Sequence, residues 1–247
     1  MQKKSIAVAA LIVLMGSSAT FAASAGSVTN DIQTSASDIS GTASGTSATA
    51  VAAGLNVDSG DVSDVTNSVT ADGGITANAA TDNSTAVAGG VNIEDGGSAA
   101  TNISNTITTS TGSTIDAQAT GGGTTTAVAA GINMQGGSMV GGDITQSVTS
   151  DSITAGAAAD DSTAVAGGLN AQGGAYVDTF NNTVTAGGNI SAQVTGTGNE
   201  AIAVAAGANV QNAAMVVGIT QTVTSGAVTA LAEGSQSTAV TGGVSVR

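Results

Sequence analysis

The stretch Ala127-Val128-Ala129-Ala130-Gly131 is one of six copies of a single phrase, Ala-Val-Ala/Thr-Ala/Gly-Gly. Each copy is anchored at a valine, and successive anchors are 36, 41, 37, 39 and 36 residues apart. The anchors are Val51, Val87, Val128, Val165, Val204 and Val240. Self-similarity at such a period is typical of repeat proteins, in which each repeat buries its apolar face only by stacking on the next.

Each repeat contains two further short segments, so that segment A, around the anchor valine, is followed by segments B and C. Segment B, for example Ile144-Thr-Gln-Ser-Val148, begins 14 to 16 residues after the anchor. Segment C, for example Ile153-Thr-Ala, follows it. Early copies of B and C stand at Val28-Thr-Asn-Asp-Ile32 and Ile39-Ser-Gly.

Residue alternation predicts that all three segments are β-strands. In segment A, Val128, Ala130 and Ile132 share one face of a single strand, and small residues fill the other face, as in a strand packed on both sides. Gly, Asp, Asn and Ser between the segments are typical of turns. We therefore expect an all-β protein, a β-solenoid of about six stacked coils with roughly 37 residues per repeat. A triangular coil and a two-layered coil both fit this pattern.

Segment B predicts a column of side-chain amides inside the stack. Its central residue is flanked by apolar residues of the same parity, and amides carry both donors and acceptors, so neighbouring coils can satisfy one another. The central residues are Asn30, Asn67, Asn105, Gln146, Asn182 and Gln221.

The other face of segment B carries Thr and Ser in most copies, as in Thr145, Ser147 and Thr149. This array is similar to the Thr-x-Thr faces of ice-binding solenoids, and it defines an alternative function as a surface adhesin or ice-binding solenoid. Asp31 and Asn181 interrupt the array, and high β-propensity alone also explains exposed threonine in strands.

The segment order predicts an incomplete coil at each end, because the first B and C have no preceding A and the last A has no following B and C. Open ends that match each other generate a contact that does not close, and such contacts produce filaments. We therefore expect end-to-end assembly, with the protein as its own partner. The expected interface residues are Val28, Asn30, Ile32, Ile39, Val240, Val244 and Val246.

The composition of the 247 residues excludes several classes of function. The chain has no Pro, Cys, His or Trp, two Phe, one Tyr and three basic residues. Zinc and haem sites need His or Cys, and Ser-His-Asp or Cys-His catalysis needs His. Nucleic-acid grooves need clustered Lys and Arg with aromatic partners. The chain lacks the residues for all of these sites. A carbohydrate-active β-helix enzyme would need aromatic sugar platforms as well as converging carboxylates. We expect no enzyme, no catalytic residue, no nucleic-acid partner and no small-molecule substrate.

The N-terminal sequence is typical of a secretory signal peptide. Lys3 and Lys4 precede an apolar run at 6–15 and then small residues, and cleavage fits after Ala22 or Ala25. The prediction is a signal peptide over 1–22 and a solenoid over 23–247. The mature chain then keeps one basic residue, Arg247, against 17 acidic residues, a formal charge of −16. We expect a secreted protein, extracellular or at the cell surface.

The acidic residues gather mainly in the turns, as in the pair Asp160 and Asp161. Their repulsion is expected to keep the chain soluble before assembly. Oxygen-rich turns also leave Ca²⁺ as a conceivable ligand, although the Gly-Gly-x-Gly-x-Asp calcium repeat is missing, and we expect no cofactor.

Together these features resemble the subunits of bacterial extracellular fibres, the curlin-like and Fap-like functional amyloids. The shared features are a secretion signal, a mature chain rich in Gly, Ala, Ser, Thr and Asn, and imperfect repeats with inward Asn and Gln, with a period closer to the Fap type. The resemblance implies a structural fibre of a biofilm matrix or cell surface, exported by outer-membrane machinery.

Overall fold

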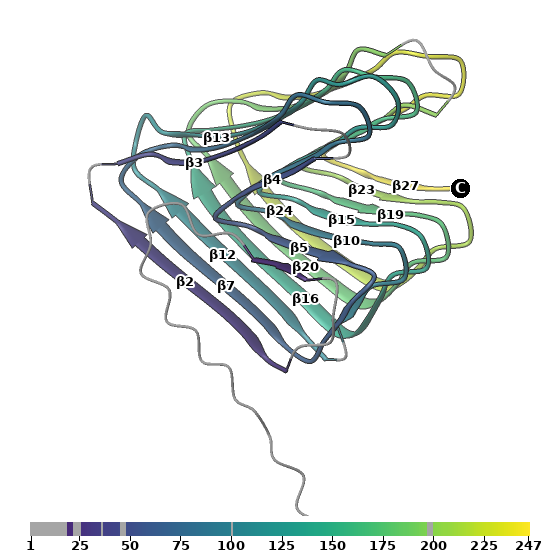
Figure 1. The fold of residues 1–247 in the computed structure, drawn as a ribbon, viewed down its shortest axis with the longest axis horizontal. Coiled ribbons are helices and arrows are strands. Elements are labelled where there is room, and N and C mark those ends of the chain that lie inside the picture. The colour runs from purple at the N-terminus through teal and green to yellow at the C-terminus, as the bar shows by residue number, and fades with distance from the viewer. Residues whose placement is uncertain (1–18, 22–25, 36, 45–47, 100, 197–199) are drawn as a thin grey trace, which may run out of the picture.

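The computed structural model describes residues 19–21, 26–35, 37–44, 48–99, 101–196 and 200–247. Within these ranges every regular element is a β-strand, and the strands form four parallel sheets that run through a stack of coils (Figure 1). The all-β solenoid of about six coils expected from the repeats is confirmed.

Segments B and C each form one sheet. Sheet B contains β2 (Val28–Thr34), β7 (Val65–Ala71), β12 (Ile103–Thr109), β16 (Met139–Ser150), β20 (Tyr176–Ala186) and β24 (Met215–Thr224), and β6 (Asp61–Val62) and β11 (Ser98–Ala99) extend it beside the start of β16. Sheet C contains β3 (Ile39–Ala43), β8 (Ile75–Ala79), β13 (Thr114–Ala119), β17 (Ser152–Ala157), β21 (Ile190–Val194) and β25 (Val228–Ala232).

Segment A forms two sheets, named A1 and A2 here. Sheet A1 contains β4 (Thr49–Ala52), β9 (Thr85–Ala88), β14 (Thr126–Ala129), β18 (Thr163–Ala166), β22 (Ile202–Ala205) and β26 (Thr238–Thr241). Sheet A2 contains β1 (Ala19–Phe21), β5 (Leu55–Asp58), β10 (Val91–Glu94), β15 (Ile132–Met134), β19 (Leu169–Ala171), β23 (Ala208–Val210) and β27 (Val244–Val246).

The single strand expected for segment A is wrong, because the chain bends sharply in its middle. Ala130 takes a φ of 47°, and the same place in the other coils is held by Ala or Gly, also at positive φ. Val128 therefore lies in a column of anchor valines, whereas Ile132 packs in a different core. The two side chains do not share a face.

Two cores lie on either side of this bend. Residues of sheets C and A1 pack with the second half of the sheet B strands, so that Ile115, Ala127 and Ile107 belong to one core. Residues of sheet A2 pack with the first half of the sheet B strands, as in Ile132 and Ile144. The bend therefore points inward, and the coil is two-lobed.

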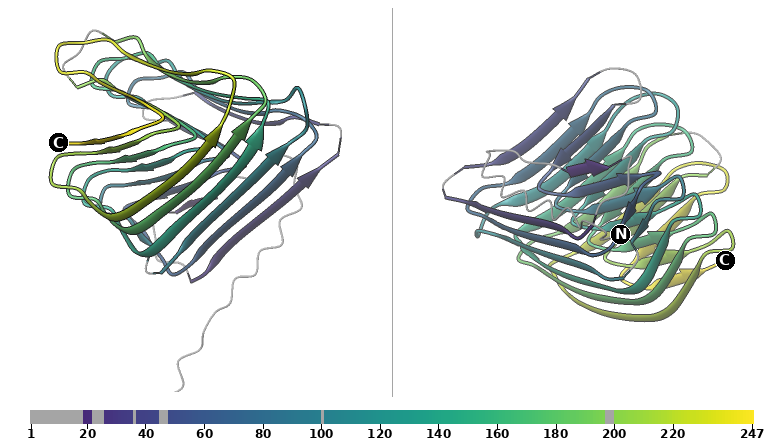
Figure 2. Two further views of the ribbon diagram at one scale, coloured as in Figure 1. Left: turned by 180° about the vertical axis from the view of Figure 1, so that it is seen from behind. Right: turned by 60° about the horizontal axis from the view of Figure 1, so that its bottom comes forward.

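Each coil runs in the order B, C, A1, A2, and the strands of the described residues give six coils that each contain all four segments. The last of them consists of β24, β25, β26 and β27, and the first of β2, β3, β4 and β5. The incomplete coils expected at the two ends are therefore not found, because each segment A closes the coil opened by the B and C before it. Seen from behind, the last coil lies in front with its edges uncovered (Figure 2, left).

Residues 1–18 and 22 of the expected signal peptide lie outside the described residues, and so do residues 23–25, which cleavage after Ala25 would also remove. Within that region the structure describes β1, which pairs in parallel with β5 through Ala19–Leu55, Thr20–Asn56 and Phe21–Val57. Strand β1 thus occupies the first edge of sheet A2.

Candidate functional site

The amide column expected in segment B is formed by hydrogen bonds along the stack. Nδ2 of Asn30 donates to Oδ1 of Asn67 at 2.7 Å, and Asn67 donates to Asn105 at 2.8 Å. Asn105 then donates to Oε1 of Gln146 at 3.3 Å, and Gln146 donates to Asn182 at 3.0 Å. Five of the six expected residues are therefore linked in sequence; we name this column the inner ladder.

The inner ladder also holds the inward bend of segment A. The amide of Asn67 donates to the carbonyl of Ala53 at 3.1 Å, and that of Asn182 to the carbonyl of Gly167 at 2.8 Å. Ala53 and Gly167 are bend residues at positive φ. The side-chain amides of the inner ladder thus donate hydrogen bonds to carbonyl groups at the bend, between the strands of sheets A1 and A2.

The inner ladder has a direction and an open end. Asn30, Asn67, Asn105 and Gln146 each donate toward the coil that follows, and Gln221 lies in register with Asn182 at the last place of the series. Its Nε2 is buried and has no hydrogen-bond partner. At the other end Asn30 uses its Nδ2 for Asn67, which leaves its carbonyl oxygen available as an acceptor.

A second amide column, the outer ladder, lies in sheet A2 and was not predicted from the sequence. Asn92 donates to Asn56 at 2.7 Å, and the series continues with bonds of 2.8 to 2.9 Å as far as Asn209. Donation runs toward the preceding coil, opposite to the inner ladder. The series ends where Ser245 replaces Asn, and Oδ1 of Asn209 is buried without a partner. The signal for it was the Asn that follows the glycine of segment A in five copies.

The expected interface residues lie at the two ends of the stack. Val28, Asn30 and Ile32 are in β2 and Ile39 is in β3, at the first coil. Val240 is in β26, and Val244 and Val246 are in β27, at the last coil. Val244 and Val246 are 54% and 74% exposed, because they continue apolar columns of the sheet A2 core that have no further coil to cover them.

A column of polar residues with opposite charges at its two ends runs along the end of sheet A2. Asp58 and Glu94 lie in register on the first two coils, and the following coils carry Gln at this place. Arg247 follows β27 on the last coil. The full column is Asp58, Glu94, Gln135, Gln172, Gln211 and Arg247; we name it the charged column.

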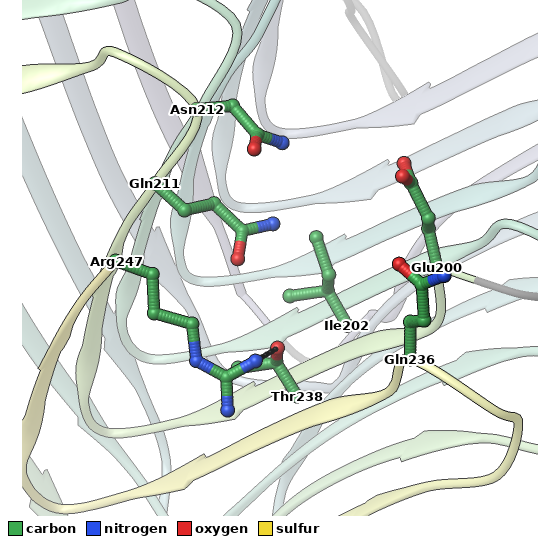
Figure 3. A pocket seen from close by; sticks show the side chains of 7 residues that line it. All are labelled: Glu200, Ile202, Gln211, Asn212, Gln236, Thr238 and Arg247. Carbon is green, nitrogen blue, oxygen red and sulfur yellow. Dashed lines mark hydrogen bonds between the residues drawn. The ribbon is translucent and has the colours of Figure 1, made fainter.

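Arg247 lies in a shallow pocket at the last two coils (Figure 3). Its Nη1 donates to Oγ1 of Thr238 at 3.1 Å, and Gln211 lies on its side of the pocket, across from Glu200 and Gln236.

Glu94, at the acidic end of the charged column, has a carboxyl group whose charged form is disfavoured by its surroundings. Burial raises the pKa of its carboxyl above the usual value, the hydrogen bond from Asn92 opposes that rise, and the neighbouring Asp95 and Asp58 add to it. The basic residues of the chain are Lys3, Lys4 and Arg247, and Arg247 lies at the far end of the stack.

Carboxylates of the turns and of the short strand β6 bind the neighbouring coil. Asp61 accepts a hydrogen bond from Ser98 at 2.5 Å, and Asp82 accepts one from the backbone N–H of Gly122 at 2.7 Å. In the part of the chain that the structure describes, no three acidic residues come together in a way that could hold a metal ion.

The Thr and Ser array forms in-register columns on the outer face of sheet B. Thr66, Ser104 and Thr145 lie side by side on successive strands, and Asn181 follows in the same column. The columns are mostly exposed, so the hydroxyls face solvent.

Comparison of the chain with protein-family models, with curated proteins and with solved structures found no match. Among the described residues, no helix has the length and apolar character needed to cross a membrane.

Proposed function

We propose that this protein is a secreted structural subunit that assembles head to tail into extracellular or cell-surface fibres of the biofilm-matrix type. The two ends of the solenoid support this proposal, since they carry the same four sheets in the same order. Stacking a second copy would place β24 on β2, β25 on β3, β26 on β4 and β27 on β5. The assembly would continue all four sheets without a change in coil shape.

The observation that carries the proposal is the open end of the inner ladder. A buried amide without a partner costs about 1–3 kcal/mol, and Nε2 of Gln221 is such a group. Gln221 lies in register with Asn182 at the last place of the inner ladder. If the Gln221 side chain turns its amide toward the open end, Asn30 of a second copy would lie at the next place of the ladder and could accept its hydrogen bond. Solenoids that remain monomeric usually cover their ends, and the described residues of the last coil are uncovered.

The glycine that follows each bend provides a direct experiment. A Cβ on Gly90 or Gly207 would come within 2.7 Å of a valine Cγ1 on the next coil, whereas the nearest atom to a Cβ on Gly243 is 3.7 Å away and belongs to Thr241. Gly243→Ala should therefore fold normally and fail to assemble, because Val51 of the next copy would clash with the new methyl group.

Gly242→Ala is the matched control for this experiment. A Cβ there meets no atom within 4 Å, and Ala naturally holds the same bend position at Ala53, Ala130 and Ala206. Electron microscopy and light scattering of both variants and the unmodified protein would report assembly. Absence of fibres from the unmodified protein, or equal assembly of both variants, would contradict the proposal.

The exposed hydroxyl columns favour a second candidate, a surface adhesin or ice-binding solenoid. Regular in-register hydroxyls such as Thr106 and Ser147 form a flat repetitive surface. Thermal hysteresis of a monomeric species, abolished by Thr106→Lys on that face, would favour this candidate over the fibre.

A further inference from the structure

The edge of sheet A2 at the first coil is filled by a strand of defined pattern. Strand β1 places Ala19, Thr20 and Phe21 beside Leu55, Asn56 and Val57, so a hydroxyl residue lies on Asn56 between two apolar residues. The backbone edge of β5 therefore accepts a parallel strand, and the residues of the strand found there read apolar, hydroxyl, apolar in sequence.

Strand β27 has the same pattern, because it reads Val244, Ser245, Val246. On the preceding coil these residues pair with Ala208, Asn209 and Val210, so Ser245 lies on an Asn just as Thr20 does. The opposite edge of β27 carries no strand of the described chain. A second copy thus offers the strand that fits the edge of β5.

The register that follows from this pairing also joins the two ends of the charged column. If Val246 takes the place of Phe21 beside Val57, the next residue, Arg247, lies beside Asp58. Asp58 and Glu94 are neighbours in register, and the carboxyl of Glu94 is partly buried beside two other carboxylates. A guanidinium at this place would form a charge-assisted pair with them.

We propose that β27 of one copy replaces β1 on β5 of the next, with Ser245 on Asn56 and Arg247 paired with Asp58 and Glu94. This inference rests on the proposed head-to-tail assembly and adds its register and its ion pair. In the unprocessed chain β1 holds the place of the neighbour, and cleavage after Ala22 or Ala25 removes it.

Cysteine cross-linking of the chain that begins after Ala25 tests the register, since β1 is then absent from the edge of β5 and the protein has no Cys of its own. Neighbouring residues of a parallel pair lie about 4.8 Å apart, and disulfides span Cα separations of about 4.4–6.8 Å. Under mild oxidation the double variant Asp58→Cys/Arg247→Cys should give a ladder of covalent oligomers on a non-reducing gel. Asp31→Cys/Arg247→Cys, with one cysteine on sheet B, should give none.

A charge exchange tests the ion pair. Arg247→Glu and Asp58→Lys each place like charges across the contact, and each should require about tenfold more protein to assemble. An equimolar mixture should assemble at a lower concentration than either variant alone, because each contact of an alternating fibre again joins opposite charges at positions 58 and 247.

The outcomes separate this inference from the proposed function. Fibres that form without Asp58–Arg247 cross-links, or that form equally well from either single charge variant, would overturn the register and leave the fibre function in place. Absence of fibres from the unmodified protein would overturn both.

Discussion

Gly131 lies directly against Val165 of the following coil, and a Cβ built on Gly131 would come within 2.7 Å of Cγ1 of that valine. The same relationship joins Gly54 to Val87 at 2.8 Å and Gly168 to Val204 at 3.0 Å. The repeated glycine of the phrase is therefore needed because the bend of one coil packs against the anchor valine of the next.

Replacing Gly131 with Ala should destabilise the fold by about 1–3 kcal/mol, the usual cost of overpacking a filled core. Urea unfolding of the variant would measure this loss. The control is Gly243→Ala, which meets no side chain and should shift stability by less than about 0.5 kcal/mol. A Gly131→Ala variant as stable as the unmodified protein would show that the contact relaxes freely.

Asn105→Leu should cost about 2–4 kcal/mol of folding free energy, because it leaves two buried acceptors without their donor. Asn105 donates to the carbonyl of Gly89 at 3.2 Å and to Gln146 at 3.3 Å. Asn30→Leu at the end of the ladder removes a single bond and should cost about 1 kcal/mol. Equal losses in the two variants, measured by chemical unfolding, would argue against cooperation within the ladder.

Glu94→Gln should stabilise the protein at neutral pH and remove part of its pH dependence. The pKa of Glu94 is raised in the fold by burial, so between the unfolded and folded values the native state holds a proton that the unfolded chain has lost. Stability contributed by the protonated carboxyl is present below the unfolded pKa and is lost as pH rises through the folded pKa.

Unfolding curves at about pH 4 and about pH 7 would measure this effect, because they bracket the ordinary range of Glu. The stabilising effect of Glu94→Gln should be larger at the higher pH. Glu233→Gln, which makes the same change at an exposed carboxyl of the last coil, is the control. An identical effect of Glu94→Gln at both pH values would contradict the prediction.

Thr20→Pro in the full chain should shorten the lag before assembly, because proline removes the backbone donor in the middle of β1 and weakens its pairing with β5. Thr20→Val keeps that donor and should retain the lag of the unmodified chain. Kinetics followed by light scattering would distinguish the two. If both variants assemble with the same lag, β1 does not compete with a second copy for this edge.

Much of the fold follows from residue periodicity. The phrase around Val128 recurs at a nearly constant interval, and the parity of Ile144, Gln146 and Val148 places the inner amides correctly, because strands alternate with a period of two. The bend at Ala130 could not be predicted in this way, since an alanine at positive φ is indistinguishable in sequence from one in a regular strand. Missing that bend hid the outer ladder, made segment A one strand and shifted the expected boundaries of the coils.

Each of the two ladders donates its hydrogen bonds in one direction only, so the axis of the solenoid is polar and its two ends differ. A neighbour that approached the last coil with its axis reversed would present its own last coil there, so Asn30 and Asn56 of the first coil would not meet the ends of the two ladders. A stack of such molecules therefore has a distinct beginning and end, and each addition preserves the orientation of the first subunit.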